Sequence, residues 1–488
     1  MLAVYKKNKI LFGLLILFMT LRLVDIGNDI TNSDAARWHR RSVKFLNALK
    51  QDELESTYQH YQPGVTLMWL NSVVKHTSLK TQENAGQEVK TLEHAGYYPT
   101  LHGTSKAVMV GVLGILFILQ FLAISKLFNR KTAILYGLLV ATEPYLIGID
   151  RWFHLTSFET FFAFTSFLML MLWKNTGKKH LLTLSAVLFS LAVYSKLTAA
   201  ITAIALLVVF LTAKKRKHLL KSFLTFSAIS LGIFVLLLPA LWVEPGMVIE
   251  KFYSAVVNAV GNDIRYAMLT PLSAKLFYPL VLSFKLSPFT LALFAAAILN
   301  VKAYKKDKNA ALIIVYFVVY FAGLSLADKK IDRYALALIP PALLLGAYHL
   351  QKLKLLAQVV FLTLSVTFTI WVISVYHPVY SAYYSPAFGG PQNALDIGIF
   401  ENSGEYFAQA AQYLNKKEDK PLVAVPNNTD AFAFHYKGPV TTVEEGADYI
   451  VWSHDIDRPD RPIYDGCRLE KSFTVQKFSY LHIYSCIL

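Results

Sequence analysis

Long apolar runs alternate with short polar clusters over the first three quarters of the chain. A helix that crosses the hydrocarbon core of a bilayer, roughly 30 Å thick, needs about 20 mostly apolar residues. Eleven runs approach this length and predict spanning helices near residues 10–26, 104–125, 132–149, 155–173, 181–195, 197–213, 222–242, 273–300, 310–327, 335–350 and 355–376. The pattern therefore predicts an α-helical polytopic membrane protein.

Lysine and arginine in the short loops predict the orientation of these spans. One set of alternate loops holds twenty cations: Lys6, Lys7, Lys9, Lys126, Arg130, Lys131, Lys174, Lys178, Lys179, Lys214, Lys215, Arg216, Lys217, Lys221, Lys302, Lys305, Lys306, Lys308, Lys352 and Lys354. Cationic segments resist translocation, so this side is expected to face the cytoplasm together with the amino terminus. An odd number of spans then places the carboxyl terminus outside.

Two polar regions fall on the opposite, external side. The first is the loop 27–103, whose apolar stretch from Gly64 to Val74 is too short to cross and predicts an interfacial or partly re-entrant helix. The second is 377–488, where helical spacing is followed by short strand-like runs. We expect a transmembrane domain over 1–376 and a small external soluble α/β domain over 377–488.

Composition supports the membrane interpretation and raises a question about charge. The 488 residues are 55% hydrophobic and 16% charged, whereas a soluble domain carries about 25% charged residues. The 48 Lys and Arg exceed the 32 Asp and Glu, which gives a net charge of +16. Such a surplus can indicate nucleic-acid binding, but twenty of the cations are explained by the predicted cytoplasmic loops. We expect membrane lipids as partners and no nucleic acid.

The sequence gives little indication of a cofactor. Cys467 and Cys486, the two cysteines of the chain, both lie in the external region. A disulfide that closes this loop would stabilise by about 3 kcal/mol on the entropic model, and two free buried thiols are an equal alternative. No P-loop, Rossmann glycine pattern, CxxC or HExxH motif is found, so neither a metal nor another cofactor is expected.

Asp34 is the candidate catalytic residue. It lies just beyond the outer end of the first predicted span, in the stretch Thr31–Trp38. A carboxylate at this level can act as a general base on an acceptor hydroxyl that arrives from outside. The alternative is a structural role, because Ser-Asp before Ala-Ala-Arg-Trp is also a good N-cap of a helix.

Several cations at the same external level are candidates for binding an anionic substrate. Arg151 and His154 lie in a very short connection between two spans, and an Arg can clamp a phosphate through its planar fork. Lys196 separates two short spans. Interfacial anchoring is the alternative for the arginine, and snorkelling of the side chain is the alternative for the lysine.

The loop 327–334 departs most from the charge rule. It carries Lys329, Lys330 and Arg333 on the external side, followed by Tyr334. An anionic lipid-linked substrate would compensate these charges, and so would aspartates of the same loop.

These segments together resemble a known family. Their order along the chain is Leu21–Leu23, Ser33–Trp38, Gln62–Trp69, Asp150–His154 and Lys329–Tyr334, followed by His377–Gly390 where the last span leads into the external domain. This order resembles the GT-C superfamily of glycosyltransferases, in particular the group of bacterial protein O-mannosyltransferases and aminoarabinose transferases (glycosyltransferase family 39-like). The resemblance extends from the first span to about residue 416.

The resemblance implies an enzyme that transfers a sugar, mannose or a related one, from a polyprenyl phosphate to an acceptor hydroxyl with inversion. The acceptor would be a protein, a glycolipid or a cell-envelope polymer. Asp34 matches the acidic residue that deprotonates the acceptor in the family. The residues matched to binding of the lipid phosphate and sugar are Arg151, His154, Lys196, Lys329, Lys330, Arg333 and Tyr334. The enzyme would lie in the plasma (inner) membrane, with its active site and carboxyl-terminal domain extracytoplasmic.

Three positions depart from the family pattern. Ala35 and Gln62 stand where many members carry an acidic residue and a histidine, and Thr156 stands where an aspartate is common. A catalytically silent relative is therefore one alternative. A transporter or lipid flippase is another, although such proteins usually show two similar halves, and we find no internal repeat in the sequence.

Overall fold

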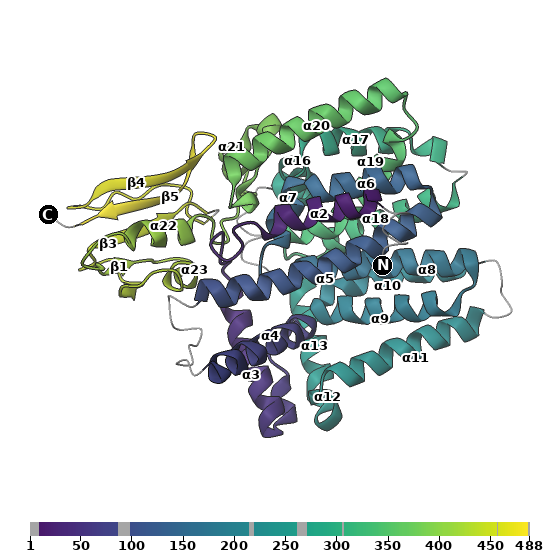
Figure 1. The fold of residues 1–488 in the computed structure, drawn as a ribbon, viewed down its shortest axis with the longest axis horizontal. Helices are drawn as coiled ribbons and strands as arrows, with labels where there is room; N and C mark the ends of the chain where they lie inside the picture. The colour runs from purple at the N-terminus through teal and green to yellow at the C-terminus, as the bar shows by residue number, and fades with distance from the viewer. Residues whose placement is uncertain are drawn as a thin grey trace.

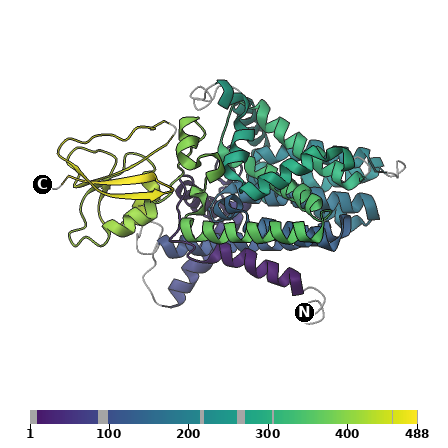
Figure 2. The ribbon, with the colours of Figure 1, turned by 90° about the horizontal axis from the view of Figure 1, so that it is seen from above.

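The computed structural model describes residues 9–85, 98–213, 219–260, 271–304, 307–455 and 457–486. A helical bundle fills most of the molecule, and a small sheet lies beyond one end of it (Figure 1). The same separation is visible from above (Figure 2).

The bundle contains helices of very different lengths. They are α2 (Lys9–Leu23), α5 (Tyr98–Leu127), α6 (Arg130–Thr142), α7 (Pro144–Asp150), α8 (Leu155–Thr176), α9 (Lys179–Ser195), α10 (Thr202–Leu211), α11 (Leu219–Leu237), α12 (Ala240–Val243), α13 (Pro245–Val260), α15 (Pro271–Lys275), α16 (Phe277–Lys285), α17 (Pro288–Leu299), α18 (Lys308–Leu326), α19 (Ile339–Leu350) and α20 (Leu355–Tyr376). Short 3-10 helices η2 (Leu197–Ile201), η4 (Val301–Tyr304) and η5 (Asp332–Leu338) connect them.

Every one of the eleven predicted spans contains helix. Within the described residues, five helices are long and apolar enough to cross a membrane, namely α5, α8, α11, α18 and α20. The pair α6 and α7, bent by 63°, makes up to six. Proline begins α7 and also α17, because its missing N–H is unneeded in a first helical turn. These breaks leave pieces too short for a single span, so the count of eleven stays a prediction.

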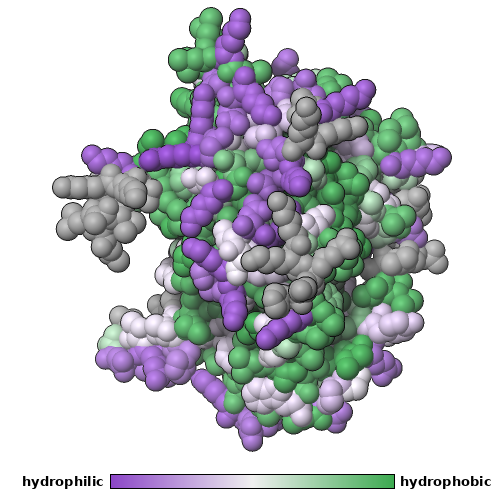
Figure 3. All heavy atoms as spheres, turned by 90° about the vertical axis from the view of Figure 1, so that its right-hand side faces the viewer, coloured by the Kyte–Doolittle hydropathy of each residue, from purple (hydrophilic) through white to green (hydrophobic). Residues whose placement is uncertain are grey.

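The predicted cytoplasmic loops meet at the end of the bundle that lies away from the sheet. Asn309 Nδ2 donates to the Leu127 carbonyl at 2.6 Å, and Asn129 Nδ2 donates to Gln351 Oε1 at 3.0 Å. Hydrophilic side chains are spread over this end (Figure 3). Eight of the loop cations lie outside the described residues: Lys6, Lys7, Lys214, Lys215, Arg216, Lys217, Lys305 and Lys306. The gathering of the loops agrees with the sequence, whereas the side that faces the cytoplasm stays a prediction.

The first external region folds into α3 (Ala35–Gln51), η1 (Leu54–Thr57) and α4 (Val65–Asn84). The predicted short helix is thus a 20-residue helix. Gly64 precedes it with a φ of +58°, and a Cβ there would lie 2.1 Å from the Trp38 ring. Only glycine fits this position, because the tryptophan fills the space of a side chain and the backbone is left-handed.

The carboxyl-terminal region forms a five-stranded mixed sheet in the order β2-β1-β3-β5-β4. The strands are β1 (Val423–Ala424), β2 (Val440–Thr441), β3 (Tyr449–Ser453), β4 (Arg468–Val475) and β5 (Phe478–Ser485). Strand β1 pairs in parallel with β2 and β3, and β5 runs antiparallel to β3 and β4. The same region contains the helices α22 (Phe407–Leu414) and α23 (Thr429–Ala433). Cys467 and Cys486 form a disulfide. The predicted small α/β fold is confirmed.

The chain between the last helix and the sheet packs on the bundle. It contains η6 (Tyr380–Ala382), η7 (Pro386–Phe388) and α21 (Gly390–Asp396). Its far end reaches the first external region, where the Ser33 N–H donates to the Ser403 carbonyl at 2.8 Å. A domain boundary at residue 377 stays a prediction, but residues 377–405 bring the carboxyl-terminal region onto the end of the bundle where α3 begins.

Candidate active site

A polar cavity of about 210 Å³ opens at the end of the bundle that carries the sheet. It collects residues from the start of α3, the turn before α4, the start of α8, the junction of α9 with η2, the loop before η5 and the first turn of η5. The lining is Asp34, Arg37, Trp38, Arg41, His60, Tyr61, Gln62, His154, Leu155, Lys196, Lys329, Ile331, Arg333 and Tyr334. Six of the eight residues that the sequence proposed for the site therefore meet here.

Asp34 faces this cavity rather than the backbone of the helix it precedes. It occupies the N-cap position of α3, yet its side chain accepts no capping hydrogen bond. Asp34 Oδ2 instead accepts from Arg333 Nη2 at 3.1 Å and lies 3.4 Å from His154 Nε2. Its other oxygen lies 3.5 Å from Arg37 Nη1, and the side chain is 24% exposed. The side chain of Asp34 therefore does not cap the helix, and its catalytic role stays a prediction.

Its surroundings keep the Asp34 carboxyl ionised. Burial alone raises the pKa of this carboxyl, but the hydrogen bond from His154 and the charges of Arg333 and Arg37 outweigh burial, so the pKa lies well below its usual value. An ionised carboxylate can accept a proton, although a low pKa makes it a weak base.

His154 holds Asp34 as a neutral hydrogen-bond donor. Burial lowers the pKa of the His154 imidazole to about 4. The Thr156 N–H donates to its Nδ1 at 3.3 Å, and the Thr156 hydroxyl lies 3.0 Å from the same atom. Since Nδ1 accepts, the proton of the neutral ring lies on Nε2, which points at Asp34. Thr156, one of the departures from the family pattern, thus sets the orientation of the histidine.

Arg333 links Asp34 to a carboxylate from the far end of the chain. Its Nη1 donates to Glu401 Oε1 at 2.7 Å, and its side chain is 12% exposed. Burial lowers the pKa of this guanidinium, but the neighbouring carboxylates Glu401 and Asp34 together raise it above its usual value. Arg333 therefore stays charged between two acids.

Lys196 forms the deep cationic wall of the cavity. Its Nζ lies 3.4 Å from Glu159 Oε2 and 3.5 Å from the centre of the Tyr334 ring. Thr198 donates a second hydrogen bond to Glu159. Burial lowers the pKa of the Lys196 amine to about 8, with Glu159 opposing the shift. A buried ammonium above an aromatic face is well placed to meet an anionic group.

The rim of the cavity is also cationic. Arg41 stacks over the Trp38 ring at 4.5 Å, and Lys329 Nζ lies 3.5 Å from the Tyr61 hydroxyl. Arg37 is the most open of the lining cations, with 63% of its side chain exposed. Five cations thus surround Asp34, the one carboxylate in the lining within the described ranges.

Arg151 does not line the cavity. Its Nε donates to Asp29 Oδ2 at 2.9 Å, and its Nη1 donates to the carbonyls of Leu21 and Val24 at 3.3 and 2.8 Å. Asp29 also accepts from Lys106 at 2.6 Å. This cluster is buried and fastens the end of α2 to the bundle, so the position of Arg151 indicates a structural role instead of contact with a substrate.

Lys330 also lies outside the cavity lining. Its Nζ donates to the carbonyls of Ser325 and Ala327 at 2.7 and 2.5 Å, beyond the end of α18. Asp332, considered from the sequence as a partner for the loop cations, lies 3.5 Å from Lys285 of α16. Burial raises the pKa of the Asp332 carboxyl to about 7, an effect that the nearby Glu401 reinforces.

Sequence reasoning missed several lining residues and one partner. Arg37, Arg41 and His60 follow no pattern that separates them from an ordinary polar loop. Glu401 lies 68 positions after Arg333 in a segment without periodicity, so no sequence signal joins the two.

The other two departures from the family pattern are also placed by the structure. Ala35 is fully buried and offers no group to the cavity. Gln62 Oε1 accepts from the Leu197 N–H at 3.2 Å and so ties the turn before α4 to the segment of Lys196.

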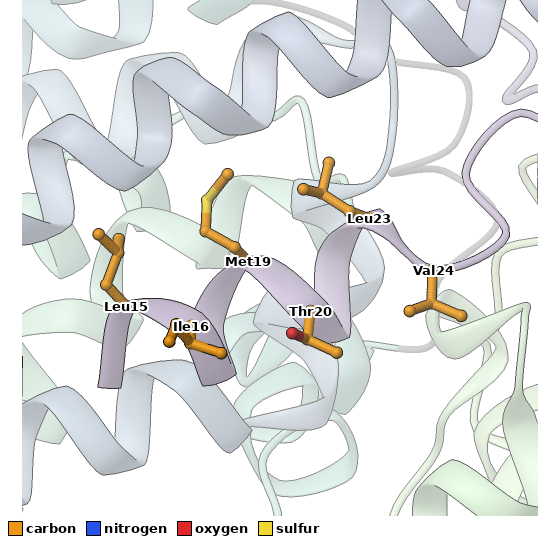
Figure 4. Close-up of a pocket in the computed structure, with 6 residues that line it drawn as sticks. All are labelled: Leu15, Ile16, Met19, Thr20, Leu23 and Val24. Carbon is orange, nitrogen blue, oxygen red and sulfur yellow. The ribbon is translucent and has the colours of Figure 1, made fainter. Parts of the chain in front are cut away.

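Two further features bear on the chemistry. A shallow groove of about 490 Å³ lies open along α2 and is lined by Leu15, Ile16, Met19, Thr20, Leu23 and Val24, which carry no charge (Figure 4). Among the residues that the structure describes, no group of three His, Cys, Asp or Glu side chains could hold a metal ion. The polar cavity around Asp34 is therefore the candidate active site.

Comparisons with known proteins give a likeness of fold. The sequence matches no protein-family model and no curated protein. The structure is similar to ArnT from Cupriavidus metallidurans bound to undecaprenyl phosphate, with a TM-score of 0.55, 12% identity and 98% of each chain covered. It is also similar to an oligosaccharyltransferase from Archaeoglobus fulgidus, with a TM-score of 0.48, 14% identity, and 91% of this chain and 61% of that chain covered. Because the match to ArnT covers 98% of this chain, the chain shares the fold of that structure.

Proposed function

We propose that this protein is a membrane glycosyltransferase that moves a sugar from a polyprenyl phosphate to an acceptor hydroxyl. The observation that carries the proposal is Asp34, an ionised carboxylate held by His154 in a cavity with five cations. The likeness to a structure with bound undecaprenyl phosphate supports a lipid-linked donor. A partly exposed carboxylate in a cavity lined by five cations suits a reaction that releases a phosphate.

The reaction is a single displacement. Asp34 takes the proton of the acceptor hydroxyl, and the hydroxyl oxygen forms a bond to the anomeric carbon. The bond between that carbon and the phosphate oxygen breaks, and the lipid phosphate leaves with the electron pair. Arg333 and Lys196 stabilise the charge that develops on the phosphate. A displacement of this kind inverts the anomeric carbon.

The finer assignments belong to the same proposal. The donor sugar is mannose or a related sugar, and the acceptor is a protein, a glycolipid or a cell-envelope polymer. With the cationic loops in the cytoplasm, the cavity and the sheet lie on the outer side of the plasma membrane. Lining cations supply positive charge at the phosphate, and we propose no dedicated metal site.

The test is transfer of labelled sugar from polyprenyl phosphate donors to envelope acceptors by the purified full-length protein. Asp34→Asn is expected to lower the rate by about 10²–10⁴-fold, the usual contribution of a general base. The matched control is Asp430→Asn, which breaks a partly exposed ion pair with Arg40 at 3.1 Å and is expected to keep the activity. Undiminished transfer by Asp34→Asn removes Asp34 from the mechanism. Substrate counterflow in liposomes without transfer would favour a transporter instead, and donor binding without transfer a silent relative.

A further inference from the structure

Two of the three guanidinium nitrogens of Arg333 donate hydrogen bonds to carboxylates of the chain. Nη1 donates to Glu401 at 2.7 Å, and Nη2 donates to Asp34 at 3.1 Å. The remaining nitrogen, Nε, is buried and has no hydrogen-bond partner within the described parts of the chain. An unpaired buried donor is costly, so this edge of Arg333 is prepared for a group that the protein itself does not supply.

The geometry of an arginine identifies that group. Nε and Nη2 point in the same direction and can donate two parallel hydrogen bonds to one carboxylate or phosphate. Asp34 uses Nη2 alone, because its Oδ2 also lies 3.4 Å from His154 Nε2 and its Oδ1 is directed to Arg37. The phosphate of a polyprenyl-phosphate sugar is a diester whose two non-bridging oxygens can accept at both positions of the edge, where Asp34 occupies one.

We propose that the phosphate of the lipid donor takes the Nε–Nη2 edge of Arg333 from Asp34, while Glu401 keeps Nη1. This inference rests on the proposed function and adds an order to it. Before the donor arrives, Arg333 holds Asp34; after the exchange, Asp34 is free to face the acceptor. The donor must therefore bind before the acceptor is activated.

The exchange also changes the strength of the base. Arg333 is one of the groups that hold the pKa of the Asp34 carboxyl far below its usual value. A phosphate bound to Arg333 neutralises that charge and adds a negative one nearby, so the pKa of Asp34 rises toward the range of an effective base. Asp34 then accepts the proton of the acceptor hydroxyl only when a sugar donor is present.

Glu401 is the positioning residue in this arrangement. Without it, both Nη atoms of Arg333 would be available to Asp34, which could then hold the end of the guanidinium with two bonds. By occupying Nη1, Glu401 leaves Nε and Nη2 as the edge for which Asp34 and a phosphate would compete. Glu401 lies in the segment 377–405, which packs on the bundle and so brings this carboxylate to Arg333.

The first test measures binding of undecaprenyl phosphate to the purified full-length protein by isothermal titration, without any transfer step. Asp34→Asn is expected to bind about tenfold more tightly than the wild type, because the phosphate no longer displaces a charge-assisted bond. In an Arg333→Lys background the same substitution is expected to give no gain, since lysine lacks the fork. An unchanged or weaker affinity in Asp34→Asn overturns the inference, and so does an equal gain in the Arg333→Lys background, which would reflect general electrostatics.

The second test concerns Glu401. Glu401→Gln is expected to weaken binding of undecaprenyl phosphate several-fold, because Asp34 then holds Arg333 more firmly. Adding Asp34→Asn is expected to restore the affinity, which a merely structural defect would not allow. The matched control is Glu470→Gln, which breaks an ion pair with Lys417 at 2.8 Å in the sheet domain and is expected to leave the affinity unchanged. Tighter binding in Glu401→Gln, or a loss that Asp34→Asn does not restore, overturns the positioning role.

The two proposals fail in different ways. If the affinities behave as expected but no donor supports transfer, the proposed function fails and the exchange at Arg333 stands. If transfer is observed but Asp34→Asn does not tighten binding, the proposed function stands and the exchange fails.

Discussion

Replacing Arg151 with methionine tests whether this cation has a structural role or binds the substrate. Arg151 is 1% exposed, and its partner Asp29 is completely buried. Removing one partner of a buried ion pair costs about 3–5 kcal/mol. Lys106 remains at 2.6 Å from Asp29. The loss of the Arg151–Asp29 pair alone is therefore expected to cost about 3 kcal/mol, the lower end of this range. The bonds to the carbonyls of Leu21 and Val24 add about 1 kcal/mol each, which gives a total of about 5 kcal/mol.

The assay compares stability and donor binding in the same preparation. Arg151→Met is expected to lower the midpoint of thermal unfolding in detergent and to leave the KM for the lipid donor unchanged below that midpoint. Lys329→Met, on the rim of the cavity, is the matched variant with the opposite expectation: an unchanged midpoint and a raised KM. If Arg151→Met raised the KM tenfold while the midpoint stayed constant, Arg151 would touch the substrate and the reasoning from burial would be refuted.

Three further predictions concern folding. Gly64→Ala is expected to lower both stability and activity, because its Cβ would meet the Trp38 ring at 2.1 Å and the left-handed backbone adds about 1–2 kcal/mol; thermal unfolding and transfer rates check this. Burial lowers the pKa of His435 to about 4, so the unfolded chain binds more protons between about pH 6.5 and pH 4 and stability falls as the pH drops through that window. His435→Gln is expected to flatten this dependence in unfolding midpoints measured against pH. Serine at both Cys467 and Cys486 is expected to cost about 3 kcal/mol through the opened loop, measured as faster proteolysis of the sheet domain.

The sequence was informative about the bundle because the hydrophobic pattern is local. Each predicted run became helix, since an apolar run between polar clusters has one way to satisfy its backbone in a membrane. The number of spans was harder to predict because helix length depends on breaks. Ser287 and Pro288 divide the run 273–300 into α16 and α17, and a hydropathy window averages over such a break.

The site was predicted in part for a similar reason. Six predicted site residues lie at or near the ends of helices, and helix ends on one side of a bundle lie at the same level. These residues are Asp34, His154, Lys196, Lys329, Arg333 and Tyr334. Arg151 and Lys330 carry the same sequence signal, a cation at that level, but turn into the protein. Glu401 depends on how the segment beyond α20 returns to the bundle, which no local pattern encodes.

Pairing with a carboxylate does not by itself distinguish the functional cations. Arg151 is paired with Asp29, Lys196 with Glu159, and Arg333 with Asp34. The three cations differ in what else surrounds each side chain besides its carboxylate partner. Arg151 donates to carbonyls of its own bundle, so its charge is already used for packing. Arg151 and Arg333 each keep one buried nitrogen without a hydrogen-bond partner among the described residues, Nη2 and Nε respectively, so an unpaired donor alone does not separate them. Lys196 and Arg333 line the polar cavity, whereas Arg151 is absent from its lining. The cations on the predicted external side therefore form two groups, those that line the cavity and those that do not. Which group a cation belongs to depends on side-chain packing in the folded chain.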